Sequence, residues 1–468
     1  MAVTTECISV SYTNGCQLQY FREQTLSLIK KVSADISISN TKLTEVLGTS
    51  ETLADTPETS SQDLQCFIVL SSLGIEIFRK LDELLPLPDY RDYAIVTVSL
   101  ATFSDKRDQW TSGTAFTNAT YLLAKYNLLV TKPCVLVDHV LRELIRPLFA
   151  KSNHPEVTAQ GRKALHPSPR IHGSSLLEAE TKPWKFGKIY SVTVFRWVLL
   201  KFAEALVEAN WPLVIPPILT LIDDDSPEYK AKGCELLAIL LRVTPPALLV
   251  RTGLGEVFYD AVMPCLSYLP SLTPQDQSLR LLGDAYPTLI TLSRLRYPSD
   301  DKRKERVGML DQVMRKGVLN GYFHCSDNVK IVESLVSQMR LLVSEMGIWS
   351  VKHLKDMIPM LSDILSEPFA TAYPPLLITT IQTLQTIILT DWPRIAAHRA
   401  EVLRGLTFCW LKLMEDGPKV ASFNELKQGL KDSLKLLKAA VQNEVDIDAD
   451  VKLLSQSDER LAELLISE

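Results

Sequence analysis

The chain of 468 residues is 46% hydrophobic and 22% charged, proportions that are ordinary for a folded soluble protein with a solvated exterior. Its net charge of −5 gives no long-range attraction to nucleic acid or to anionic lipid, so neither is an expected partner. Glycine is sparse, at 18 residues, and strand-like alternation is rare, which predicts an all-α protein. The length would suggest about three globular domains, but a repeat protein escapes that expectation because its core grows lengthwise.

Eight cysteines occur, and none forms a Cys-x-x-Cys pair. The first twenty residues are polar and lack the pattern of a secretory signal. We therefore expect reduced thiols and a cytoplasmic and nuclear location. Cys234, Cys265 and Cys409 lie in apolar helical runs, which indicates small core residues.

The first 150 residues are expected to form an irregular helical region. Its predicted parts are an amphipathic helix over 16–47, a flexible linker over 48–63, a helix over 64–84, a break at 86–88, and helices over 112–131 and 134–150 that join at Lys132-Pro133.

Residues 151–186 are the largest polar interruption and are predicted to be a loop or insertion. Loops of this length are either functional or mobile. His154, His166 and His172 fall here, but their spacing provides no scaffold for a metal, so we interpret them as solvated. Helices resume near Ile189, which predicts HEAT-like repeats over 187–442. An acidic C-terminal tail follows over 443–468, with a weak helix near 458–466.

Residues 211–241 contain one short apolar helix, an acidic turn at Asp223-Asp224-Asp225, and a second apolar helix. Pro216 and Pro217 are best tolerated in a first helical turn, and Ser226 is a candidate cap for the second helix. Neither helix can bury its broad apolar surface alone, which is the logic of a helical repeat. Leu219 is a predicted core residue, so an aspartate there should unfold or dissociate the protein.

Two series of prolines share one spacing. Pro216, Pro264 and Pro359 form the first, and Pro227, Pro274, Pro368 and Pro418 form the second. The missing member of the second series falls near Asn320-Gly321, which is itself a turn signal. The period of about 47 residues predicts a HEAT/armadillo-like helical-repeat solenoid.

Other apolar segments are interpreted as core. The tryptophans at 197, 211, 349, 392 and 410 lie in apolar helical contexts. Residues 368–390 carry no charge after Glu367 and are long enough to span a membrane, but a buried central helix is the favoured interpretation.

Charged and aromatic residues near the acidic turn are the candidate partner contacts. Asp223 or Asp225 is expected to pair with Lys230 and so to set the register of the repeats. Trp184, in the polar sequence Lys182-Pro183-Trp184-Lys185, is either an exposed interface anchor or docks onto the protein's own helices, the favoured alternative. The candidate contact residues are Trp184, Lys185, Asp223, Asp224, Lys230 and Lys232.

The sequence carries no motif that predicts catalysis or a cofactor. It has no phosphate-binding Gly-Lys-Ser/Thr loop, no Gly-x-Ser-x-Gly elbow and no His-Glu-x-x-His. His324-Cys325 lacks further ligands for zinc, and the acidic turn lacks the spaced ligands of a calcium loop. The basic run Lys302-Arg303-Lys304 with Arg306 is interpreted as a solvated turn, with a nuclear address or a contact with an acidic partner as alternatives. We therefore predict a non-enzymatic protein without a metal or cofactor.

Several short motifs, in order, resemble those of the second Tel-two-interacting protein family, the smallest subunit of the Triple T assembly. They are Arg146-Pro147-Leu148-Phe149, Gly161-Arg162-Lys163, Pro183-Trp184-Lys185, Pro216-Pro217-Ile218-Leu219 with Ile222-Asp223-Asp224, Lys230 with Gly233, Thr252-Gly253-Leu254 and Ser267-Tyr268-Leu269-Pro270. The similarity covers roughly residues 138–300, with a fainter continuation to 415.

This resemblance implies an all-helical adaptor without catalytic residues. Its direct partners would be the Tel-two protein and the first interacting protein. Working with the ninety-kilodalton heat-shock chaperone, the assembly would mature the phosphatidylinositol-3-kinase-related kinases. The alternatives are a HEAT-repeat cargo or transport adaptor, a regulatory subunit of another complex, and an enzyme with residues 152–186 as a lid.

Overall fold

The computed structural model describes residues 57–84, 90–150, 155–158, 160–164, 181–442 and 445–465. Every regular element in these ranges is helical, apart from one isolated antiparallel bridge between Val157 and Lys163. This confirms the predicted all-α class and is consistent with a helical solenoid. The predicted helix over 16–47, the break at 86–88 and the three loop histidines lie outside the described residues. The chain divides into two compact units, Met1–Thr220 and Leu221–Glu468.

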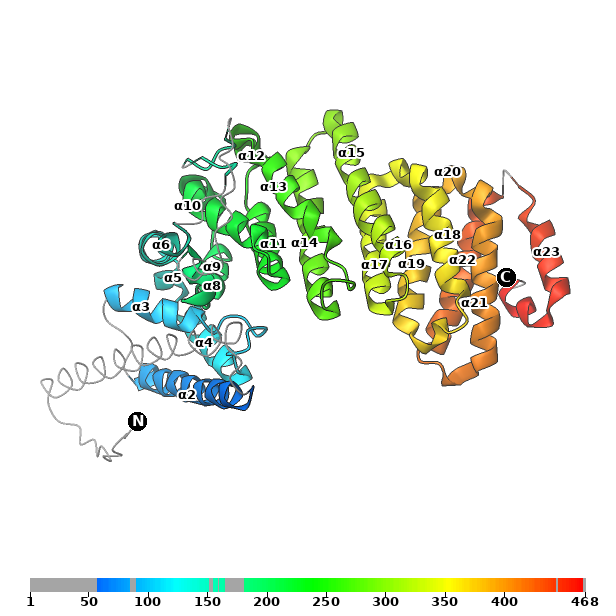
Figure 1. Cartoon of the computed structure of the whole chain (residues 1–468). Helices are drawn as coiled ribbons and strands as arrows, with labels where there is room; N and C mark the ends of the chain where they lie inside the picture. The colour runs from blue at the N-terminus through cyan, green and yellow to red at the C-terminus, as the bar shows by residue number, and fades with distance from the viewer. Residues whose placement is uncertain are drawn as a thin grey trace, which may run out of the picture. The chain divides into compact units, whose positions relative to one another are not determined.

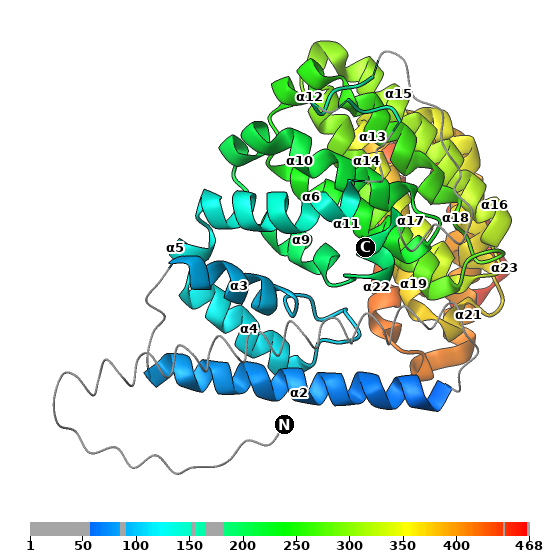
Figure 2. The same ribbon diagram turned by 60° about the vertical axis from the view of Figure 1, so that its left-hand side comes forward.

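The first unit is built from short helices. Helix α4 packs against both α2 and α3, and the π-helix η2 packs against α3 and α9 (Figure 2). The helices are α2 (Pro57–Leu84), α3 (Tyr90–Ala101), α4 (Gly113–Lys125), α5 (Asn127–Val130), η2 (Cys134–Ile145), α6 (Arg146–Phe149), α8 (Pro183–Phe186), α9 (Ser191–Leu199) and α10 (Glu204–Asp223).

The helices predicted over 64–84, 112–131 and 134–150 are confirmed as α2, as α4 with α5, and as η2 with α6. The linker prediction is wrong for residues 57–63, because α2 begins at Pro57, where a proline does not interrupt the hydrogen bonds of a first helical turn. Ser112 caps helix α4, because its side chain accepts a hydrogen bond from Ala115 N.

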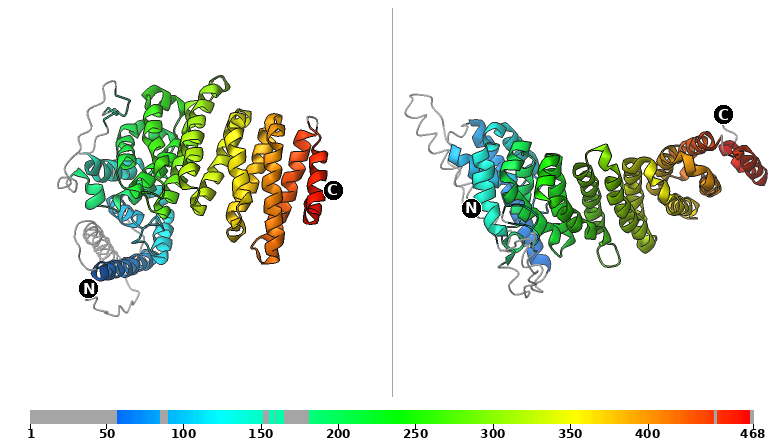
Figure 3. Two further views of the ribbon diagram at one scale, coloured as in Figure 1. Left: turned by 45° about the vertical axis from the view of Figure 1, so that its right-hand side comes forward. Right: turned by 90° about the horizontal axis from the view of Figure 1, so that it is seen from above.

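The second unit contains two rows of helices. In the first row, α11 (Pro227–Arg242), α14 (Gln275–Arg296), α17 (Val329–Met346), α19 (Pro374–Thr390) and α22 (Phe423–Val441) each pack against the next (Figure 1). Figure 3 shows the same succession from other sides. The second row comprises α13 (Leu254–Val262) with η4 (Met263–Ser267), α15 (Arg303–Val313) with η6 (Met314–Leu319) and α16 (Asn320–Cys325), α18 (Leu354–Ser366), and α21 (Arg399–Asp416).

The helices of the first row are joined by polar contacts as well as by apolar packing. Thr288 Oγ1 on α14 donates to the main-chain oxygen of Cys234 on α11, at 3.0 Å. Thr383 Oγ1 on α19 donates to the main-chain oxygen of Val336 on α17, at 3.2 Å. In the second row, Ser362 Oγ on α18 donates in the same way to Glu401 O on α21, at 2.8 Å. A hydroxyl at a crossing point thus satisfies its own bonding need and fixes the register of two helices.

The first-row helices begin at Pro227, Gln275, Val329, Pro374 and Phe423, intervals of 48, 54, 45 and 49 residues. These unequal intervals do not confirm a fixed period of 47. The turn predicted at Asn320-Gly321 is wrong, because both residues lie in α16. The turn falls instead just before α17, whose cap Asn328 accepts a hydrogen bond from Ile331 N at 3.2 Å.

Two local predictions near the acidic turn are wrong. Helix α10 breaks at Asn210, so Pro212 lies in the first turn of the new segment and Pro216 and Pro217 lie beyond it. The Ser226 side chain does not cap α11; instead Asp224 Oδ1 accepts from Ser226 N at 3.0 Å and forms the turn. Leu219, by contrast, is fully buried, as predicted.

The C-terminal segment predicted as an acidic tail contains helix α23 (Ile447–Ser457), η11 (Glu459–Leu461) and α24 (Ala462–Leu465). Leu461, Leu464 and Leu465 are buried, and α24 packs against α22. Trp410 Nε1 on α21 donates to the main-chain oxygen of Arg460 at 2.8 Å. These contacts make the segment the last layer of the second unit.

One described helix, α10, is long and apolar enough to cross a membrane, and 56% of its most apolar window is buried. The pair formed by α11 and α12 (Pro246–Thr252) also passes by composition, although it is bent by 119°. A core helix of a globular protein passes the same test. Helix α19, in the uncharged stretch noted above, is not among these candidates.

Gly233, on α11, lies very close to the backbone of Leu221 and Ile222. A Cβ there would lie 2.7 Å from Ile222 N and 3.0 Å from Leu221 C, so a methyl group must displace backbone. We expect Gly233→Ala to cost about 1–3 kcal/mol of stability and to lower the melting temperature measured by circular dichroism.

The matched control is Gly283→Ala on α14, where an added Cβ meets nothing within 4 Å. That change should be neutral or should stabilise the helix by about 0.5–1 kcal/mol. Equal melting temperatures for the two variants would contradict the proposed close packing at Gly233.

Candidate protein-interaction surface

Trp184 does not lie at the surface. Its side chain is fully buried and stacks on Phe149, with ring centroids 5.3 Å apart. The favoured expectation, docking onto the protein's own helices, is therefore confirmed, and the alternative of an exposed anchor is wrong. Lys185 is half-buried, with its Nζ 5.4 Å from the centroid of the Phe186 ring. Two of the motifs that carry the family resemblance thus pack against each other.

Lys230 has a structural role within the second unit. Its Nζ donates to the main-chain oxygen of Ile222 at 2.8 Å and lies 5.2 Å from the centroid of the Tyr268 ring. The predicted ion pair with Asp223 or Asp225 is therefore replaced by a main-chain hydrogen bond. Because Lys230 is buried, its ammonium group satisfies an end carbonyl of α10 and is not available to a partner.

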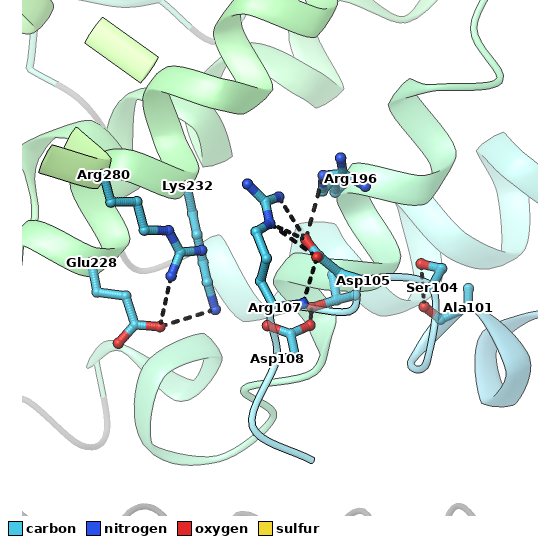
Figure 4. A network of polar contacts seen from close by, with 10 residues as sticks. Ala101, Ser104, Asp105, Arg107, Asp108, Arg196, Glu228, Lys232 and Arg280 are labelled. Atoms are coloured by element: carbon cyan, nitrogen blue, oxygen red, sulfur yellow. Dashed lines mark hydrogen bonds and ion pairs between the residues drawn. The ribbon is translucent and has the colours of Figure 1, made fainter. Parts of the chain in front are cut away.

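Lys232 belongs to a small charge cluster on the second unit. Glu228 Oε1 lies 3.5 Å from Lys232 Nζ and 3.9 Å from Arg280 Nη1, so the carboxylate connects α11 with α14 (Figure 4). Partly exposed pairs of this kind contribute about 0–1 kcal/mol each. Of the candidate contact residues, Lys232 remains partly accessible, and its contact with a partner stays a prediction, as does that of Asp223.

The first unit holds a tighter network around Asp105. Arg107 Nη2 lies 2.6 Å and Arg196 Nε 3.6 Å from Asp105 Oδ2 (Figure 4). The neighbouring Asp108 accepts a hydrogen bond from Thr193. Burial raises the pKa of Asp105, but the hydrogen bonds and charge of Arg107, with the charge of Arg196, outweigh it and hold the pKa at about 2. The network fastens the loop after α3 to α9 and is therefore structural.

Two tryptophans predicted to be core lie at the surface of the second unit. Trp349 is 48% exposed and Trp392 is 57% exposed, whereas Trp197, Trp211 and Trp410 are buried as predicted. Trp349 belongs to the 3₁₀ helix η7 (Gly347–His353), which follows α17. Trp392 begins helix α20 (Trp392–Ile395), which follows α19.

A direct bond joins the turns that carry these tryptophans. Ser350 Oγ donates to Asp391 Oδ1 at 2.8 Å, and η7 packs against α19. Ile348 and Leu389, beside the two tryptophans in sequence, are 46% and 63% exposed. We name Ile348, Trp349, Leu389 and Trp392 the tryptophan patch.

Titratable groups lie buried beneath the tryptophan patch. Asp391 is fully buried, and this burial raises its pKa to about 7, although the hydrogen bond from Ser350 opposes the shift. His353 is also buried, with its Nε2 2.9 Å from Asp311 Oδ1. Burial lowers the pKa of His353 below its ordinary value, although Asp311 opposes that shift.

Basic residues gather along the edge of the second unit that carries the patch. Residues 294–306, 345–356 and 391–399, the three turns after α14, α17 and α19 with their flanks, contain ten Lys and Arg against six Asp and Glu. The basic run at 302–306 belongs to this edge, because Arg303 Nη2 lies 3.6 Å from the position of a Cβ on Gly347. Arg294 on α14 also pairs with Glu345 at the end of α17. The edge is positive although the chain is negative.

Sequence reasoning missed the patch because Trp349 and Trp392 sit next to apolar runs that continue the pattern of α17 and α19. The signals that could have found it are Gly347, with a φ of +57°, and Trp392-Pro393, which places a proline in a first helical turn. Each marks the end of a long helix, and residues in such connections face solvent more often than the helices that they join.

Within the described ranges, no group of three or more His, Cys, Asp or Glu side chains is arranged to hold a metal ion. Cys234, Cys265 and Cys409 are buried, as predicted. Burial raises the pKa of the Cys409 thiol to about 12, so this thiol is not activated as a nucleophile. The apolar and basic side chains of the second unit that stand out are therefore those along the edge formed by the turns after α14, α17 and α19.

The buried carboxyl of Asp391 predicts a pH dependence of stability. The pKa of Asp391 is about 7 in the folded state, against an ordinary value of 3.8. Between these two pH values, the folded state therefore keeps a proton on Asp391 that the unfolded state has released. Its stabilising contribution is full below about pH 4 and is lost as the pH rises through 7. The loss amounts to at most about 4 kcal/mol.

Asp391→Asn should remove this dependence, since an amide does not titrate. We expect the variant to melt near the wild-type temperature at pH 4 and above it at pH 8, as measured by circular dichroism. A difference in melting temperature that is the same at both pH values would contradict the assignment to Asp391.

Comparisons with known proteins agree with the motif resemblance. The Tti2 family profile matches residues 96–372. TEL2-interacting protein 2 of Saccharomyces cerevisiae is 25% identical over 287 residues, which cover 58% of this chain and 66% of that protein. TELO2-interacting protein 2 of Mus musculus is 23% identical over 223 residues, covering 48% of this chain and 41% of that protein.

The chain thus spans less than two thirds of the length of these relatives. The profile covers more than half of the chain, and it includes all the motifs on which the resemblance was based. It also extends to residue 96, upstream of those motifs. The protein belongs to the Tti2 family.

Proposed function

We propose that this protein is a non-enzymatic adaptor subunit of a complex that contains the Tel-two protein. The observation that carries the proposal is the family match, because the relatives in yeast and mouse are named for their interaction with that protein. Those names describe binding and no reaction, which favours an adaptor over an enzyme.

The fold supports the same function. Rows of helices that contact only their neighbours form an extended surface, which helical-repeat proteins use to bind partners. The second unit offers its turns on both edges, and one edge concentrates exposed aromatic and basic side chains. Such a surface suits a large protein partner better than a small molecule, which is usually bound in a concave pocket.

The finer parts of the proposal follow from the family. The complex would include the first interacting protein as a second direct partner and would work with the ninety-kilodalton heat-shock chaperone. Its clients would be the phosphatidylinositol-3-kinase-related kinases, which it would help to mature in the cytoplasm and nucleus. No cofactor is required for this role.

Affinity purification of the tagged full-length chain from cells of its source tests the adaptor function. We expect stoichiometric recovery of the Tel-two protein by quantitative mass spectrometry. Gly283→Ala should recover as much as wild type, while Gly233→Ala, which disturbs α11, should recover less. Recovery of transport factors alone, or of no stoichiometric partner, would overturn the proposal.

Depletion of the protein tests the client proposal. The steady-state amounts of the phosphatidylinositol-3-kinase-related kinases should fall several-fold while their transcripts stay constant, and re-expression of the wild-type chain should restore them. Unchanged kinase levels after complete depletion would remove kinase maturation from the proposal and leave the adaptor function intact.

A further inference from the structure

The tryptophan patch brings together four exposed apolar side chains of the second unit. Four large apolar side chains, each more than 40% exposed, lie in or beside two turns that hydrogen-bond to each other. On the opposite edge, Leu272 and Phe369 are exposed singly, and Phe323 and Val329 flank one turn. Scattered apolar residues are ordinary on a surface, but a contiguous group marks an interaction site. Tryptophan is also the residue type most enriched at the energetic centres of interfaces.

The patch is held in place before any partner binds. The Ser350–Asp391 hydrogen bond ties η7 to the start of α20, and both of these side chains are fully buried. His353 and Ile395 anchor the same two elements from below, since each is 1% exposed or less. Preorganised side chains lose little conformational entropy on association, which favours tight binding.

The charges around the patch indicate what it binds. Several cations of this edge are already neutralised within the protein: Arg294 by Glu345, Lys352 by Asp311 and Arg399 by Asp450. Lys355 and Arg394 are exposed and form no ion pair with any described residue. Arg394 lies two residues beyond Trp392, and Lys355 lies six residues beyond Trp349, at the start of helix α18. These two cations are therefore available to an acidic partner.

We propose that the tryptophan patch, with Lys355 and Arg394, docks an acidic amphipathic segment of a protein partner. The apolar side chains of the segment would cover Trp349 and Trp392, and its carboxylates would face the two cations. This inference deepens the proposed adaptor function and rests on it, because it names the chemistry of one bound partner.

A lipid surface is the competing class of ligand, since tryptophan with lysine and arginine also suits a membrane interface. The distribution of charge favours a protein. Asp300, Asp301, Glu305 and Asp356 are exposed among the cations of the same edge, and they would repel an anionic bilayer. A protein segment can place its carboxylates beside Lys355 and Arg394 and avoid those anions.

The first experiment compares the full-length wild-type chain with Trp349→Ala/Trp392→Ala and with Lys355→Glu/Arg394→Glu. The control is Phe323→Ala/Phe369→Ala, which removes aromatic side chains that are even more exposed, at 79% and 80%, from the opposite edge. The probe is the Tel-two complex recovered from cells depleted of this protein, immobilised for interferometry. Both patch variants should bind at least tenfold more weakly than wild type, and the control should bind within twofold of it.

The charge variant also has a salt signature. Wild-type affinity should fall as ionic strength rises, and Lys355→Glu/Arg394→Glu should flatten that slope. Because these two side chains are exposed, the charge variant should melt at the wild-type temperature, so its readout does not depend on the folding of the tryptophan variant. Wild-type affinity in both patch variants would overturn the docking proposal while leaving the adaptor function standing. Absence of the Tel-two protein from the wild-type complex would instead overturn the adaptor function.

The second experiment identifies the bound segment. A photo-crosslinking phenylalanine derivative replaces Trp392 in the full-length chain, and Phe323 in the control, and crosslinked peptides are sequenced from the purified complex. The proposal requires a partner peptide, from position 392 only, that is amphipathic and carries a net negative charge. A crosslink to a second copy of this chain, or to a basic segment, would overturn it. Tryptophan-dependent sedimentation with phosphatidylcholine–phosphatidylserine vesicles would overturn it in favour of a membrane.

Discussion

The second unit depends on one physical constraint, which is that each helix must bury its broad apolar face against the next copy. Helix α14 illustrates it, because its buried positions contact α11 on one side and α17 on the other. The close approach at Gly233 sets how near α11 lies to the preceding segment. The hydroxyl-to-carbonyl hydrogen bonds of Thr288 and Thr383 fix the register between neighbouring helices. Stability in such an arrangement is a sum of nearest-neighbour interfaces, so a fault in one helix is felt by the adjacent layers.

This constraint leaves the turns free to vary, and their variation creates the surfaces that carry function. The acidic turn at 223–225 is used internally, since Asp224 forms the turn and Lys230 satisfies a carbonyl of α10. The turns after α17 and α19 differ, because each places a tryptophan in solvent while a buried Ser350–Asp391 bond holds the two together. Turn residues that lie beside apolar helices therefore pack internally in one turn and face solvent in another.

An adaptor needs a rigid frame and a surface that distinguishes partners, and both can be recognised in this chain. The frame comes from buried apolar rows that extend to the last helices, where Trp410 reaches the main chain of Arg460. The distinguishing surface comes from the uneven distribution of charge, with a positive edge on a chain of net charge −5. Electrostatic complementarity of this kind contributes more to the choice of partner than to raw affinity.

The sequence by itself determined the helical class, the positions of most helices in the described ranges, and the core role of Leu219, Cys234 and Trp211. These features follow from local periodicity and from the low glycine content, which one chain displays without any knowledge of its neighbours. The motifs also determined the family, since they recur in order along the chain.

The tertiary structure decided the rest. It buried Trp184 against Phe149 and exposed Trp349 and Trp392, and it gave Lys230 a carbonyl partner in place of a carboxylate. It also placed the basic run beside Gly347. Burial of a turn residue depends on which distant helix passes over it, and periodicity within one helix carries no information about that packing.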